Sequence, residues 1–184
     1  MRAGGTEFIV TASADEKSPR GWLRREADAY RNGNERPLGG YLVLAGMYTV
    51  ATAALAGAAR SLGRTVLTPG PWDLALLTVA THKAARLIAK DPITSPFRAP
   101  FTTFEGTSAE SELAESVRGE GFRHAAGELI VCPMCLGQWV ATGFSLSWIL
   151  APQTTRLAMS MLTAVAGADF LHHSYAALQQ ATEG

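Results

Sequence analysis

The sequence predicts an all-α protein, a multi-pass transmembrane bundle of about four helices with a proline-rich loop on the cytoplasmic side. Three observations lead to this fold class. Long stretches of the chain carry no charge, the first of them at 40–59. Charged residues make up only 17% of the 184 residues, below the roughly 25% usual in soluble domains. Basic residues also collect on one side of the predicted spans, as they do in membrane proteins.

Four segments are candidate spans, at 40–59, 72–89, 136–151 and 157–178. About 20 apolar residues, each rising 1.5 Å, cross a hydrocarbon core of about 30 Å. The second segment contains lysine and arginine, so it also fits an amphipathic helix that lies on the membrane surface. A soluble helical protein is the alternative to the whole interpretation.

The chain is predicted to contain a polar, flexible N-terminal segment at 1–37 and a membrane domain at 38–184. The N-terminal segment holds several arginines and lacks the charged start, apolar stretch and cleavage site of a signal peptide. It and the loop at 90–131 carry the basic excess. The positive-inside rule therefore predicts that this loop and both termini are cytoplasmic.

The loop at 90–131 begins with prolines at 92, 96 and 100, which favour an extended or turning path over an ordinary helix. The acidic stretch that follows is expected to be a short solvated helix opened by Thr107 or Ser108. Arg98 lies between two of the prolines and is expected to pair with an acid, for which Glu105, Glu128 and Asp169 are the candidates. The predicted binding residues are Arg98, Asp91, Glu128 and Asp169.

Cys132 and Cys135 flank Pro133 and Met134 at the start of the third predicted span. Thiolates at a helix N-terminus are stabilised by its partial positive charge, which favours a redox-active pair. The same pair supplies half of a tetrahedral zinc or iron site, to which His172 or His173 would add ligands. A third interpretation, in which the cysteines only pack as small apolar residues, requires no cofactor.

Composition and motifs exclude several functions. The formal net charge is +0, so there is no basic surplus for nucleic acid. No glycine-rich phosphate loop, Ser-His-Asp set or carboxylate pair is present, which argues against an enzyme. The expected partners are the lipid bilayer and either a second copy or another membrane or cytoplasmic protein. We therefore expect a binding or scaffold protein at the cytoplasmic membrane face, with a membrane thiol oxidoreductase or metal-binding protein as the alternative.

Several short runs carry a resemblance to a known family, and they end in Cys-Pro-Met-Cys-Leu-Gly-Gln-Trp at 132–139. The others are Arg-Leu-Ile at 86–88, Asp-Pro-Ile-Thr at 91–94, Pro-Phe-Arg-Ala-Pro-Phe at 96–101 and Gly-Glu-Leu-Ile at 127–130. Over about Leu74 to Ala177 the chain resembles a domain-of-unknown-function family of small bacterial integral membrane proteins, some of them associated with sporulation. The resemblance implies three or four helices in the bacterial cytoplasmic membrane and assigns no catalytic residue.

Overall fold

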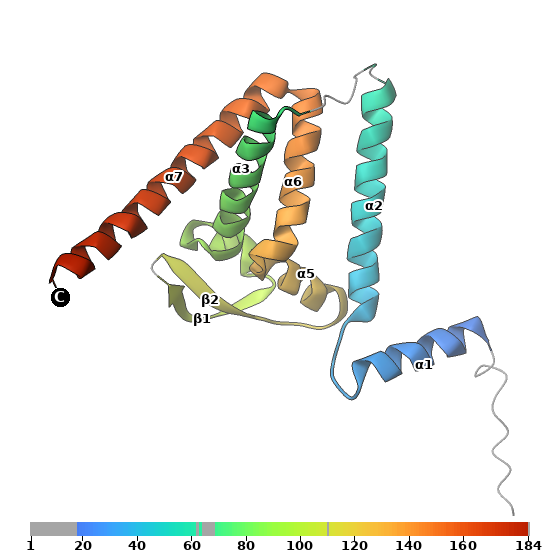
Figure 1. Cartoon of the computed structure of the whole chain (residues 1–184). Coiled ribbons are helices and arrows are strands. Elements are labelled where there is room, and N and C mark those ends of the chain that lie inside the picture. Colours follow the sequence, from blue (N-terminus) through green and yellow to red (C-terminus); the bar gives the residue numbers. More distant parts are fainter. Residues whose placement is uncertain (1–17, 62, 64–68, 110, 184) are drawn as a thin grey trace, which may run out of the picture. The chain divides into compact units, whose positions relative to one another are not determined.

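A computed structural model describes residues 18–61, 63, 69–109 and 111–183. The chain divides into two compact units, Met1–Leu38 and Gly39–Gly184. Most of the described chain is helical, as predicted (Figure 1). A small two-stranded sheet in the larger unit shows that the all-α prediction is wrong in this detail.

The smaller unit contains helix α1 (Pro19–Arg31). The hydroxyl of Ser18 caps it by accepting a hydrogen bond from the Gly21 N–H at 3.0 Å. The helix ends at Asn32, which adopts the left-handed conformation with φ 45°. Residues 19–31 of the segment predicted to be flexible therefore form a capped helix, and residues 1–17 lie outside the described part of the chain.

Helix α2 (Leu38–Ser61) covers the first predicted span. Most of its large apolar side chains are exposed, including Leu42 and Val50. It approaches α5 (Gly121–Val131) at Gly40, where an added Cβ would lie 2.8 Å from the Cβ of Ala125. A glycine is needed for this approach, since real Cβ atoms essentially never come so close.

Helix α3 (Pro71–Lys90) lies between α6 (Pro133–Leu150) and α7 (Pro152–Glu183), as Figure 1 shows. Its buried side chains are all alanines, at positions 80, 84, 85 and 89. Small side chains let helix axes approach closely, so α3 becomes the centre of the bundle.

The loop between α3 and α6 is more regular than predicted. It forms a 3₁₀ turn η1 (Pro92–Thr94), a helical turn α4 (Ser95–Arg98), a hairpin of β1 (Thr102–Ala109) and β2 (Glu112–Val117), and α5. The expected helix after Thr107 or Ser108 is wrong, because both residues belong to β1. Of the two paths expected from the prolines, extended or turning, the chain follows the turning one, because each proline lies in or beside a helical turn.

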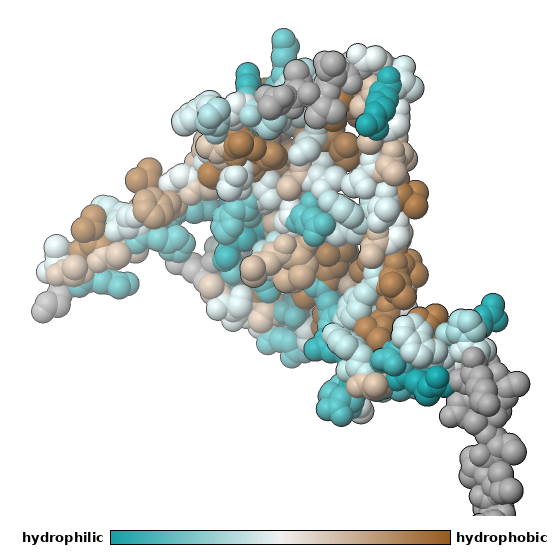
Figure 2. All heavy atoms as spheres, turned by 45° about the vertical axis from the view of Figure 1, so that its right-hand side comes forward, coloured by the Kyte–Doolittle hydropathy of each residue, from teal (hydrophilic) through white to brown (hydrophobic). Residues whose placement is uncertain are grey.

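Among the described residues, α2 alone has the length and apolar composition to cross a membrane by itself. Only 6% of its apolar window is buried within the chain, whereas the core helix of a soluble protein is mostly buried. Helices α5 and α6 meet the criterion only as a pair bent by 84°. On the face drawn in Figure 2, exposed hydrophobic side chains of the larger unit are interspersed with more hydrophilic groups.

Candidate functional site

Arg98 holds the loop to the end of α3. Its side chain is completely buried. Its Nη1 donates to the carbonyl oxygens of Ile88 and Asp91, at 2.8 and 3.1 Å, and to the hydroxyl of Thr94. The Thr94 hydroxyl donates to the same two carbonyl oxygens, so Arg98 and Thr94 together bind the backbone where α3 ends. One guanidinium thereby joins α3, η1 and α4.

The acid that pairs with Arg98 is Glu115 of β2, with Nε and Oε2 2.5 Å apart. The pairing with an acid was expected, but none of the three predicted acids is the partner. Glu105 accepts a hydrogen bond from Ser116, and Asp169 pairs with Lys83. The sequence did not indicate Glu115 as the partner of Arg98, because the strand pairing that brings Glu115 to Arg98 was not predicted.

The other predicted binding residues are dispersed over the larger unit. The Asp91 carboxylate accepts from the Ile93 N–H at 2.9 Å and thereby caps η1. Glu128 accepts a hydrogen bond from the hydroxyl of Tyr41 in α2 and lies 3.5 Å from the imidazole of His124. Asp91 and Asp169 line the same cavity, whereas Arg98 and Glu128 are not among its lining residues.

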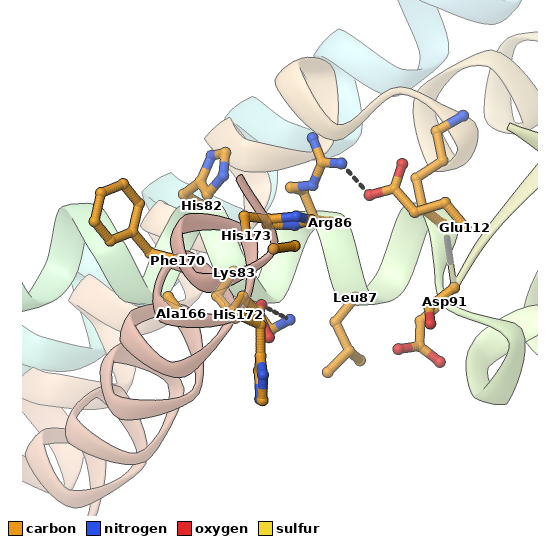
Figure 3. Close-up of a pocket in the computed structure, with 14 residues that line it drawn as sticks. His82, Lys83, Arg86, Leu87, Asp91, Glu112, Ala166, Phe170, His172 and His173 are labelled. Carbon is orange, nitrogen blue, oxygen red and sulfur yellow. Dashed lines mark hydrogen bonds and ion pairs between the residues drawn. The ribbon is translucent and has the colours of Figure 1, made fainter. Parts of the chain in front are cut away.

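A cavity of about 760 Å³ lies between α3, α7 and the start of β2. Its volume falls within the roughly 300–1,000 Å³ of small-molecule sites. Figure 3 shows the labelled side chains that surround it. Its basic groups come from α3 and α7 and are His82, Lys83, Arg86, Lys90, His172 and His173. Three of the four histidines in the chain therefore line one cavity.

The cavity also contains acids, which pair with two of its cations. Lys83 donates to Asp169 at 2.5 Å, and Arg86 pairs with Glu112 (Figure 3). These pairs are partly exposed, and such pairs contribute only about 0–1 kcal/mol each. Lys90 has no ion pair in the described part of the chain and is the cation most available to an incoming anion.

The two cysteines lie at the sharp bend between α5 and α6. Cys132 is the N-cap of α6, and its sulfur accepts from the Cys135 N–H at 3.4 Å. The hydrogen bond from the Cys135 thiol lowers the pKa of Cys132 below its ordinary value, and the charge of Lys90 acts in the same direction. Both thiols are free, and Cys135 is exposed.

The predicted metal ligands do not come together. Within the ranges that the structure describes, which include all four of Cys132, Cys135, His172 and His173, no three His, Cys, Asp or Glu side chains form a group that could hold a metal ion. The histidines line the cavity on α7, and the cysteines are not among its lining residues. The two candidate sites are therefore separate.

Two features of the site were missed by the sequence interpretation. One is Gly127, where an added Cβ would lie 2.5 Å from Val117 Cγ1 and 3.1 Å from the Phe101 carbonyl oxygen. The hairpin therefore packs on α5 at a position that only glycine fits. The other is the pairing of Arg86 with Glu112. Its only sequence signal was an arginine near the end of a predicted span.

These features define a small, mostly helical protein with a candidate membrane span and a polar, histidine-lined cavity. The chain belongs to the family described as protein of unknown function (DUF1360), whose profile matches residues 76–175. That range contains the cavity-lining residues up to His173, Arg98 and both cysteines, whereas α1 and α2 lie outside it.

A similar protein is the "Sporulation protein YjcA" of Bacillus subtilis (strain 168). The two chains are 32% identical over 97 residues, which span 51% of this chain and 81% of that protein. No solved structure matches this chain. The expected family of unknown function with a sporulation-associated member is thus confirmed, and no reaction comes with it.

Proposed function

We propose that this protein is a bacterial cytoplasmic-membrane binding protein that recruits a partner at the cytoplasmic face through the histidine-lined cavity. The observation that carries the proposal is the cavity of about 760 Å³ whose wall includes Lys90, a cation with no ion pair among the described residues. The partner chemistry that fits is an acidic side chain. A carboxylate would accept hydrogen bonds from Lys90 and from imidazole N–H groups.

The weak ion pairs inside the cavity support a site in which an incoming carboxylate can replace an internal acid as the partner of a lysine. The partly exposed ion pairs already present contribute only about 0–1 kcal/mol each, so replacing one carboxylate by another on Lys83 costs little. An incoming carboxylate can therefore compete with Asp169 for Lys83 and still gain the contact with Lys90. The apolar side chains of Leu87 and Phe170 add contact area for the rest of the ligand.

The proposed orientation is multi-pass with both termini and residues 91–131 in the cytoplasm. Its support is the concentration of basic residues at the C-terminal end of α3 and in the loop that follows. A membrane-impermeant thiol reagent added to intact cells should leave Cys132 and Cys135 unlabelled. After permeabilisation the exposed Cys135 should be labelled. Labelling in intact cells would place the loop and the cavity outside.

Photo-crosslinking tests whether the cavity recruits a partner. A benzoylphenylalanine at position 170, on the cavity wall, is expected to give a discrete adduct in cells. The same probe at position 157, exposed near the other end of α7, is the matched control. Lys90→Glu should abolish the adduct and Lys90→Arg should retain it. Equal adducts at both positions, or an adduct indifferent to Lys90→Glu, would refute the proposal.

A thiol oxidoreductase is the second candidate, favoured by the lowered pKa of Cys132 beside an exposed Cys135. In that reaction the Cys132 thiolate attacks an external disulfide, and Cys135 then displaces the bound thiol to form the internal disulfide. Two electrons and two protons pass to the two released thiols. A reversible dithiol–disulfide couple within the cytosolic range of glutathione buffers would support this activity. Two thiols that stay reduced in such buffers would exclude it.

A further inference from the structure

Helix α1 has an apolar side and a basic side. At 3.6 residues per turn, Trp22, Leu23, Ala27 and Tyr30 fall on one side of the helix. Trp22 is 54% exposed, Leu23 59% and Tyr30 71%. No residue of α1 is buried. A helix in water gains nothing by exposing a tryptophan, a leucine and a tyrosine together, so this side suits an apolar surface.

The rest of α1 is basic. Arg20, Arg24 and Arg31 fall along one border of the apolar side, and Arg25 falls near the other. Four arginines stand against two acids, Glu26 and Asp28, which leaves a formal charge of +2 on the helix. Asp28 is bound to Arg31 at 2.8 Å. Arginines that flank an apolar side bearing tryptophan and tyrosine are typical of helices at the interface of an anionic membrane.

Chain connectivity limits where α1 can lie. The segment 32–37 links the end of α1 to the start of α2, the candidate span. Fully extended, it reaches roughly 20 Å. If α2 crosses the membrane, α1 is held close to the headgroups from which α2 starts, and its effective concentration there is high.

We propose that α1 is an interfacial helix that binds the anionic lipid headgroups of the membrane leaflet at the start of α2. The apolar side chains enter the boundary between headgroups and acyl chains, and the four arginines contact lipid phosphates. This site is independent of the cavity, because it uses no cavity residue. Glu26 lies between Trp22 and Tyr30 on the apolar side, so it opposes binding, and its neutralisation should strengthen it.

Hydrogen exchange of the full-length protein in nanodiscs tests the proposal. The backbone amides of 19–31 are expected to exchange at least about tenfold more slowly in phosphatidylglycerol nanodiscs than in phosphatidylcholine nanodiscs. High salt should reduce this difference in exchange rate. Arg24→Gln/Arg25→Gln should abolish most of it. The matched control, Gln179→Glu/Gln180→Glu on α7, changes the net charge by the same amount and should leave the exchange of 19–31 unaltered.

Glu26→Gln supplies a variant of opposite sign, because it should slow the exchange in anionic nanodiscs further. Equal protection of the 19–31 amides from exchange in the two lipids would show that α1 packs against protein, or binds lipid through apolar contacts alone. Absence of protection in both lipids, or an equal effect of the control variant, would also overturn the proposal. None of these outcomes depends on the cavity or on a partner protein.

Discussion

Arg98 is expected to be among the most sensitive positions in the chain. Its guanidinium and the Glu115 carboxylate are buried, at 0% and 5% exposure, and bonded at 2.5 Å. Removal of one member of a buried ion pair leaves the other charge without a partner and costs about 3–5 kcal/mol. Arg98→Ala should destabilise the protein by that amount, because it leaves Glu115 without its partner; it also removes one hydrogen bond from each of the Ile88 and Asp91 carbonyl oxygens.

Arg98→Lys distinguishes the geometry of the guanidinium from its charge. A single ammonium cannot reach Glu115 and the carbonyls of Ile88 and Asp91 in the planar arrangement of the arginine. Loss of one charged hydrogen bond predicts a destabilisation of about 1.5–3 kcal/mol. The expected order of stability is therefore wild type, then lysine, then alanine.

Denaturant unfolding of the purified protein in detergent, followed by circular dichroism, measures these changes. Arg118→Lys is the matched control, since Arg118 is exposed and donates to one carbonyl, that of Ala99. It should change the free energy of unfolding by no more than about 0.5 kcal/mol. The double variant Arg98→Ala/Glu115→Ala should lose less than the sum of the single variants. An Arg98→Lys protein as stable as wild type would refute the reasoning.

Two further predictions concern the hairpin and the thiols. Gly127→Ala should destabilise the protein by about 1–3 kcal/mol, because the added Cβ would meet Val117. The control Gly143→Ala has open space around its Cβ and should be neutral or stabilising. Equal unfolding midpoints for the two variants would contradict the packing of the hairpin on α5. Alkylation of Cys132 by iodoacetamide should begin at a lower pH in the wild type than in Cys135→Ala. The reason is that the variant loses the hydrogen bond that lowers the pKa of Cys132. Identical pH–rate profiles would mean that the two thiols do not interact.

The four long helices were predictable because their signal is local. An uncharged or mostly apolar run of 16 to 22 residues predicts a helix whatever surrounds it, and α2, α3, α6 and α7 contain the four predicted segments except for Ala151 at the end of the third. The N-cap position of Cys132 was also readable, because Pro133 suits the first helical position.

The hairpin was not predictable to the same degree, because its sequence signals conflict. Residues 105–115 hold four glutamates, which read as a solvated helix, while the threonines and Phe104 at the start of β1 favour a strand. A two-stranded sheet is barely stable by itself. This one is held by Arg98 and Arg86, whose partners on β2 are distant in sequence. The strands therefore form because of contacts that no local pattern contains.

The sequence by itself determined the four long helices, the candidate membrane span in α2, and which residue types were available for chemistry. Tertiary structure alone decided that three histidines meet Lys83, Arg86 and Lys90 in one cavity, and that the cysteines lie apart from it. The physical reason is that helical periodicity acts over a few residues, whereas the cavity depends on the packing of α7 and the hairpin against α3. That packing is set by buried alanines, by Gly127 and by one buried arginine.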